Sequence, residues 1–244
     1  ADVAARSEVV FLSLPTPDIV VSVVTGEDGI VEGIEPGSTL VDTTTSTPET
    51  TNELADLLAE RDVTVLGAPV SGGTSGSRNA TLTTMVGGDP ATFEACTELF
   101  SAYAEDIYHV GDSPGDGHVV KLLNNYLSFL GMVGASEAVA LGERAGLDAE
   151  VMVDIFNRST GRNAATEDKF PEQIIPERYD LGFPLALMYK DLRLFSQFAD
   201  DSDANVLLGD TVRNLVGYAR KEMGEDADMS EIYKFISKRA GPDA

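Results

Sequence analysis

A lysine early in a long apolar segment is the residue of this sequence best placed for chemistry. Lys121 follows two glycines, Gly115 and Gly117, in a run whose other residues are mostly aliphatic. A helix that is apolar around most of its circumference is buried, so a lysine on it needs a polar cavity or a route to solvent. Asn125 comes one helical turn later and shares the lysine's face. This spacing is typical of a general acid/base, and a surface lysine with polar neighbours is the alternative that it leaves open.

Small polar residues collect where the predicted strands end, which is where an α/β sheet places its ligands. Hydroxyls and exposed backbone N–H groups at such ends suit a carboxylate or a phosphate, although each cluster alone is also ordinary turn chemistry. Residues 43–48 follow a strand at 38–42 and residues 68–73 follow a strand at 63–66, while the strand at 8–14 ends in the apolar pair Leu14-Pro15.

The elements that must position these residues fall into two regimes. Short β-rich runs alternate with helical segments up to about residue 112, which predicts a largely parallel sheet covered on both faces. From Gly115 onward the pattern is helical, with one long helix to about Ala145 that stops at Gly146. The predicted domains are therefore 1–114 and 115–244. Further strands are expected at 81–86 and 106–109, and further helices near 149–158, 164–175, 185–199, 205–223 and 229–238.

In this order the segments resemble the β-hydroxyacid dehydrogenase family, the group of 3-hydroxyisobutyrate dehydrogenase and tartronate semialdehyde reductase. Residues 115–125 match the family's catalytic pattern G-x-G-x-x-x-K-x-x-N-N in full, and residues 68–73 match its substrate loop. Residues 42–48 match its D-x-S-T-x-x-P segment loosely, and Lys190 opens its Lys-Asp-Leu signature. The resemblance implies an α/β Rossmann-like domain followed by an all-α domain, joined by a long interdomain helix.

The resemblance also implies roles for single residues. Lys121 would be the general acid/base that moves a proton to or from the substrate hydroxyl, and Asn125 would hold the substrate and orient that lysine. NAD or NADP would supply the redox chemistry, because the protein itself supplies proton transfer and position. The remaining implied roles are binding of the substrate carboxylate for Ser71, Gly72 and Gly73, and cofactor binding for Leu14, Pro15, Thr45 and Lys190.

One departure from the family concerns the cofactor. The family begins with a strand, a G-x-G-x-x-G turn and a helix that hold the dinucleotide pyrophosphate. The 244 residues contain no such turn. We expect the sequence to be N-terminally incomplete, because the residues that would face the cofactor are retained; a true loss of this segment is the alternative. The residue that distinguishes NAD from NADP is missing with it.

Composition narrows the function classes. The chain carries 17 Lys and Arg against 41 Asp and Glu, a net charge of −24. Nucleic acid binding is disfavoured, because it needs a basic surface. The scattered acids and the small number of lysines favour halophilic adaptation over an acidic partner-binding tail.

No apolar run is long enough to span a membrane. Cys96 is the single cysteine, which indicates a reducing cytoplasm. We expect its side chain to lie in the core. The two histidines have no other ligands at metal-binding spacing, so no metal site is predicted.

Three alternatives to a β-hydroxyacid dehydrogenase remain at this point. A 6-phosphogluconate dehydrogenase shares related motifs but has a much larger helical domain. Imine reductases typically replace the catalytic lysine that this chain keeps as Lys121. A non-catalytic homologue acting as an interaction module would explain the missing dinucleotide turn, but it has no chemical reason to keep the lysine and asparagine. The substrate would be a small hydroxy acid, and the apolar helices predict a homodimer or homotetramer.

Overall fold

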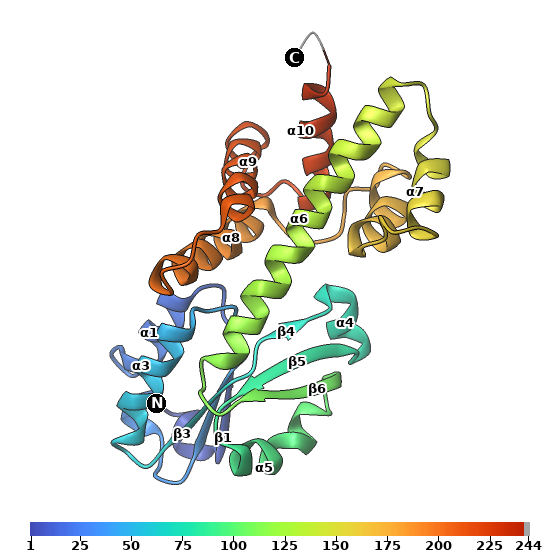
Figure 1. Cartoon of the computed structure of the whole chain (residues 1–244). Coiled ribbons are helices and arrows are strands. Elements are labelled where there is room, and N and C mark those ends of the chain that lie inside the picture. The colour runs from blue at the N-terminus through green and yellow to red at the C-terminus, as the bar shows by residue number, and fades with distance from the viewer. Residues whose placement is uncertain (242–244) are drawn as a thin grey trace. The chain divides into compact units, whose positions relative to one another are not determined.

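The computed structural model describes residues 1–241 and divides into two compact units. Unit 1 is Ala1–Leu123 and unit 2 is Asn124–Ala244. Helix α6 (Asp116–Arg144) supplies the last residues of unit 1 and the first of unit 2 (Figure 1). The predicted domain boundary between residues 114 and 115 stays a prediction, and in the structure the compact units divide within this helix instead.

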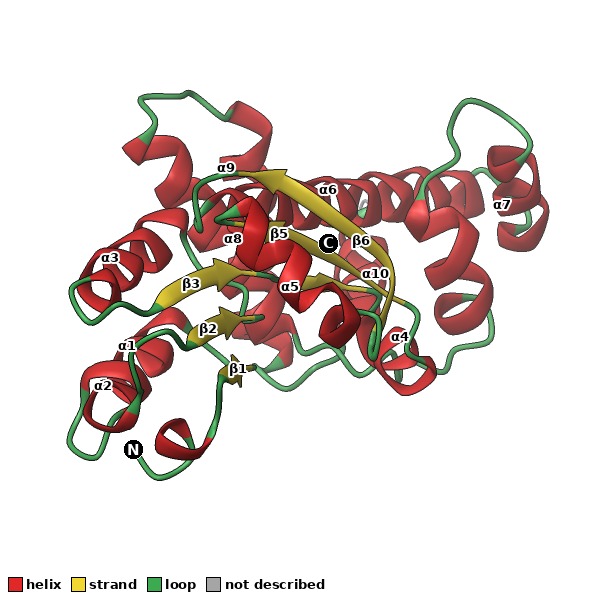
Figure 2. Ribbon diagram, turned by 90° about the horizontal axis from the view of Figure 1, so that it is seen from below, coloured by secondary structure: helices red, strands yellow, loops and turns green. Residues whose placement is uncertain are grey.

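Unit 1 is built on one twisted sheet (Figure 2). Strands β1 (Val9–Leu12), β2 (Thr39–Asp42) and β3 (Thr64–Gly67) pair in parallel. Strand β5 (Leu82–Gly87) runs antiparallel to β3 and to the two-residue β4 (Val70–Ser71), and parallel to β6 (Ala104–Gly111). The prediction of a largely parallel sheet therefore holds for β1 to β3 and for β5 with β6, but β4 and the antiparallel pairs of β5 were not expected.

The helices of unit 1 begin where side chains supply the missing backbone partners. Thr16, Thr47 and Asp89 each accept a hydrogen bond from a backbone N–H three residues on, and each is followed by proline at the first helical position. They start α1 (Pro17–Thr25), α3 (Pro48–Ala59) and α5 (Pro90–Phe100). The shorter elements are η1 (Ala4–Arg6), α2 (Ile30–Gly33) and α4 (Gly73–Asn79).

Two apolar clusters fill unit 1. One joins β1 and β2 to α1 and α3 through side chains such as Val20, Leu40 and Leu58, and the other lies under α5. Cys96 belongs to the second cluster, where it is 2% exposed beside Phe100, so its prediction as a core residue is confirmed.

Unit 2 is helical around a single apolar core that includes Met132, Leu192 and Ile232. Helix α6 ends at Arg144, where Gly146 adopts a positive φ of 84° that favours glycine. No helix among residues 1–241 is both long and apolar enough to cross a bilayer. The later elements are α7 (Ala149–Asn157), η2 (Ala165–Ile174), α8 (Leu185–Asp201), α9 (Leu207–Met223), η3 (Met229–Glu231) and α10 (Ile232–Arg239).

Element η2 is a π-helix, the wide form in which each N–H bonds the carbonyl five residues back. Pro171 lies inside it. At its end Ile175 N–H donates to the Phe170 carbonyl at 2.9 Å and Arg178 N–H to the Gln173 carbonyl at 2.8 Å. The helix expected over 164–175 is therefore present, but with a different hydrogen-bond register.

Candidate active site

The two glycines before Lys121 are contact residues. A Cβ atom on Gly117 would lie 2.3 Å from the carbonyl oxygen of Met85 and 2.4 Å from that of Gly67. A Cβ on Gly115 would lie 2.8 Å from both the Cβ and the carbonyl oxygen of Pro48. The glycines thus let the start of α6 touch the backbone of the sheet and the start of α3.

The strand residues that face the start of α6 must also lack a side chain. A Cβ on Gly67, the last residue of β3, would lie 2.2 Å from the carbonyl oxygen of Pro114. A Cβ on Gly87, the last residue of β5, would lie 2.4 Å from that of Ser113. We call Gly67, Gly87, Gly115 and Gly117 the glycine contact. It places the start of α6 directly against the ends of two central strands.

Lys121 follows on α6 and is buried, with 7% of its surface exposed. Asn125 lies one turn further along the same helix and is 9% exposed. The sequence left open whether this lysine faces a polar cavity or reaches solvent, and in the structure both side chains are buried. Residues four apart on a helix share one face, so the two side chains lie on the same side of α6.

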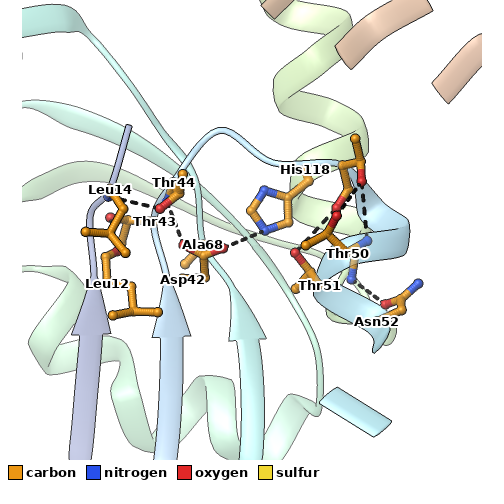
Figure 3. Close-up of polar contacts among 12 residues, drawn as sticks. Leu12, Leu14, Asp42, Thr43, Thr44, Thr50, Thr51, Asn52, Ala68 and His118 are labelled. Atoms are coloured by element: carbon orange, nitrogen blue, oxygen red, sulfur yellow. Dashed lines mark hydrogen bonds and ion pairs between the residues drawn. The ribbon is translucent and has the colours of Figure 1, made fainter. Parts of the chain in front are cut away.

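A buried acid and a buried imidazole lie under the start of α6 (Figure 3). Asp42 at the end of β2 is 2% exposed, and His118 on α6 is fully buried. Burial raises the pKa of the Asp42 carboxyl to about 6, and burial lowers the pKa of the His118 imidazole to about 3. His118 Nε2 lies 4.0 Å from Asp42 Oδ2, which is beyond hydrogen-bond distance. Near pH 7 the pair is therefore a carboxylate beside a neutral imidazole.

Threonines join the loops that follow β1 and β2. Thr44 N–H donates to Asp42 Oδ1 at 2.9 Å, and Leu14 N–H donates to Thr44 Oγ1 at 3.1 Å (Figure 3). The Thr43 hydroxyl donates to the Leu12 carbonyl at 2.7 Å. These bonds bring the predicted cofactor residue Leu14 beside the segment that contains Thr45. Thr44, which the sequence did not single out, makes the connection.

The substrate loop is formed by the end of β4 and the start of α4. Ser71 pairs with Thr83 in the antiparallel ladder, and Gly72 and Gly73 follow with φ of 126° and 62°. These positive angles favour glycine over any other residue. Ser71 is half-buried and both glycines are exposed, so this loop lies at the surface of unit 1.

In unit 2, Asp191 joins two of the predicted site residues. Asn125 Nδ2 donates to Asp191 Oδ2 at 2.7 Å, and Lys190 Nζ lies 3.1 Å from Asp191 Oδ1. Asp191 is 3% exposed, so its charge is held inside the protein by these partners. The sequence assigned a role to Lys190 only, although Asp191 stands next to it in the Lys-Asp-Leu signature. Within residues 1–241 no group of three or more acidic, histidine or cysteine side chains is placed to hold a metal ion.

Two family sequence profiles match the chain. The profile described as the NAD binding domain of 6-phosphogluconate dehydrogenase matches residues 1–111, and the profile described as NAD-binding of NADP-dependent 3-hydroxyisobutyrate dehydrogenase matches residues 115–236. The two profiles join at the residues that precede α6.

Curated proteins with similar sequences are dehydrogenases by name. The 2-(hydroxymethyl)glutarate dehydrogenase of Eubacterium barkeri is 40% identical over 79% of this chain and 64% of its own length. The NAD-dependent L-serine dehydrogenase of Pseudomonas aeruginosa is 34% identical over 98% of this chain and 82% of its own length. The human mitochondrial 3-hydroxyisobutyrate dehydrogenase is 32% identical over 97% of this chain and 72% of its own length. The chain thus spans about two thirds to four fifths of these relatives.

Solved structures agree with the sequence matches. A 3-hydroxyisobutyrate dehydrogenase of Mycobacterium tuberculosis, solved with L-serine, superposes with a TM-score of 0.87 and 28% identity, over 96% of this chain and 81% of that one. A 3-hydroxyisobutyrate dehydrogenase of Salmonella typhimurium gives a TM-score of 0.85 at 26% identity over the same shares. A Streptomyces aurantiacus imine reductase reaches 0.59 at 20% identity, which shows a shared fold only.

Proposed function

Because this chain belongs to the β-hydroxyacid dehydrogenase family of NAD(P)-dependent oxidoreductases, we propose that it interconverts a short β-hydroxy acid and its semialdehyde or keto form. The observation that carries the proposal is the placement of Lys121, buried one helical turn before Asn125. The Asn125 amide is itself fixed by the Asp191 carboxylate. These side chains are of the types that general acid/base chemistry on an alcohol requires.

The names of the relatives indicate a substrate class. 3-Hydroxyisobutyrate, 2-(hydroxymethyl)glutarate and L-serine share a primary alcohol on the carbon next to the one that bears a carboxylate. They differ only in the third substituent of the carbon between these groups. We assign the same core to the substrate of this chain, with Ser71, Gly72 and Gly73 binding the carboxylate. In support, both glycines are exposed and carry no side chain that would shield their backbone N–H groups from a ligand.

The residues fit the nicotinamide end of a dinucleotide. Leu14 and Thr45 follow the carboxyl ends of parallel strands, where such cofactors bind, and both are partly exposed. With Pro15 and Lys190 they would hold the cofactor, whose nicotinamide exchanges a hydride with the carbon that carries the hydroxyl. The chain's own contribution is the proton: Lys121 Nζ would accept it from the hydroxyl during oxidation and return it during reduction. Asn125 would hold the hydroxyl oxygen in place.

The first test of this proposal is turnover in molar KCl with NAD⁺ and NADP⁺ against the three acids above. Lys121→Met keeps the length and apolar stem of the side chain but removes the amine, so kcat should fall about 10²- to 10⁴-fold with the fold unchanged by circular dichroism. Lys221→Met on α9 is the matched control and should retain activity. Turnover that survives Lys121→Met would exclude the mechanism, and an inactive wild-type protein that binds neither dinucleotide would favour the interaction-module alternative.

We further propose that the chain assembles as a homodimer or homotetramer in a reducing cytoplasm. Exposed apolar side chains at helical spacing on α6, Val120, Leu123 and Leu127, support the assembly, because a contiguous exposed apolar patch marks an interaction surface. The single, buried thiol of Cys96 supports the compartment. Light scattering in molar KCl would measure the mass of the assembly, and a monomer would contradict it.

A further inference from the structure

Helix α6 follows a residue that has no side chain with which to cap it. The residue before its first turn is Gly115, which cannot carry a side chain because of its contact with Pro48. A helix start that is not capped by the residue before it depends on other contacts to resist fraying. Since Lys121 lies only six residues further on, about 9 Å along the axis, fraying at this point would displace the lysine.

The backbone N–H of Gly115 is held by a side chain of another helix. Asn52 Oδ1 accepts a hydrogen bond from the Gly115 N–H at 2.9 Å and a second from the Ser113 hydroxyl, also at 2.9 Å. Two donors converge on one amide oxygen, which fixes the orientation of the Asn52 side chain. Asn52 lies one turn after Pro48 on α3, so one face of α3 touches Gly115 through both residues.

Helix α3 also adjoins the predicted cofactor loop. It starts at Pro48, directly after the threonine segment whose Thr44 holds Leu14. The same helix thus contacts the segment that would face the nicotinamide at its N-terminus and the start of α6 one turn later. Every residue in this chain of contacts belongs to unit 1.

We propose that Asn52 is a positioning residue: its side-chain oxygen fixes the start of α6, and with it Lys121, relative to the loop that precedes α3. The inference rests on the proposed function. Proton transfer by the lysine and hydride transfer to the nicotinamide must occur on neighbouring substrate atoms, so their separation has to be held closely. A displacement of about 1 Å in such a geometry can reduce the rate 10²-fold.

The test compares Asn52→Ala with Asn52→Asp. The alanine variant should lower kcat about 10- to 100-fold while KM for the hydroxy acid changes less than about threefold, because the binding groups remain. The aspartate variant keeps an acceptor for both donors, and its charge suits a helix N-terminus, so it should restore most of kcat. Glu53→Ala, an exposed neighbour on α3, is the matched control and should leave kcat unchanged.

Hydrogen exchange supplies a measurement that does not depend on turnover. Asn52→Ala should accelerate exchange of the Gly115 amide and of the first α6 turn about tenfold, and Glu53→Ala should not. Ser113→Ala removes one of the two donors and should show the same changes more weakly, so it carries the test should Asn52→Ala fail to fold. Wild-type kcat in the alanine variants, or unchanged exchange at the start of α6, would overturn the inference. If the wild-type protein itself lacks activity, the proposed function fails and exchange alone decides the role of Asn52.

Discussion

At the scale of single residues, Asp42 and His118 form a buried pair whose pKa values are shifted in opposite directions. Burial keeps a proton on Asp42 up to about pH 6, above the ordinary range of an aspartate. Burial keeps His118 neutral down to about pH 3. His118 lies in the first turn of α6 and Asp42 at the end of β2, so their protonation states contribute to the free energy that holds this helix on the sheet.

The two contributions to pH-dependent stability have opposite signs. Unfolding releases the Asp42 proton between pH 3.8 and about 6, so this residue makes the protein less stable as the pH rises through that window. Unfolding lets His118 take up a proton between about pH 3 and 6.5, so this residue makes the protein more stable as the pH rises. In the wild-type protein the two effects largely cancel from pH 4.5 to 6.

Single substitutions should separate these effects. As the pH rises from 4.5 to 6.5, the unfolding free energy of His118→Gln should fall by about 2 kcal/mol relative to wild type. Over the same rise in pH, the unfolding free energy of Asp42→Asn should increase by about 2 kcal/mol relative to wild type. Urea unfolding at fixed KCl measures both, and subtraction of the wild-type values removes the contribution of the other acids. If the unfolding free energies of the two variants changed with pH in the same direction, the opposite pKa shifts of Asp42 and His118 would be contradicted.

At the scale of elements, the start of α6 depends on the absence of side chains in the glycine contact. Gly117→Ala would insert a methyl group within 2.4 Å of two carbonyl oxygens, which backbone shifts can relieve only at a cost of about 2–3 kcal/mol or more. Gly134→Ala on the same helix meets no atom within 4 Å and should stabilise the protein by about 0.5–1 kcal/mol through helix propensity. Thermal unfolding of the two variants provides the comparison, and a neutral Gly117→Ala would show that the contact is loose.

The pattern of the sequence predicted most elements because their signals are local. The parallel strands β1 to β3 are short apolar runs, and α3 and α5 carry a capping residue followed by proline. Strand β5 was predicted at 81–86, but its antiparallel direction was not, although the length of the preceding connection explains it. The helix between β4 and β5 has only seven residues, too few for the crossover that a parallel strand requires. The π-helical register of η2 was missed because apolar periodicity does not distinguish it from an α-helix.

The candidate site was predictable to the extent that motifs identify single side chains. Lys121 and Asn125 follow from their spacing, whereas Asn52, Thr44 and Asp191 act through contacts with residues far away in the chain. Asn52 and Gly115 are separated by 63 positions, and Asn125 and Asp191 by 66. Sequence motifs contain Thr44 and Asp191, but no local pattern shows which distant residue each of these side chains bonds, so only the folded chain reveals the partners.

At the scale of the whole molecule, the negative charge is distributed unevenly between the two units. Residues 1–123 contain twenty acidic and four basic side chains, and the rest of the chain contains 21 acidic and 13 basic ones. Like charges at this density repel one another in dilute buffer, and salt screens that repulsion within about 3 Å at 1 M. Unit 1 should therefore depend on salt more strongly than unit 2.

Stability should rise with salt if the chain is adapted to a halophilic cytoplasm. From 0.1 to 2 M KCl we expect the unfolding temperature to increase by about 10 °C or more, equivalent to a few kcal/mol for a chain of this size. Hydrogen exchange at low salt should show unit 1 opening first. Sucrose at matched osmolality is the non-ionic control, and a chain equally stable in dilute buffer would reopen the acidic-partner interpretation.

The glycine contact has an evolutionary consequence. When two packed side chains meet, a larger residue on one side can be compensated by a smaller one on the other. Here each of the four glycines faces at least one backbone carbonyl oxygen within 2.8 Å, and no substitution can make a carbonyl smaller. No second substitution can therefore make room for a side chain at any of these four positions. We therefore expect them to stay fixed along lineages in which the acidic surface around them drifts freely.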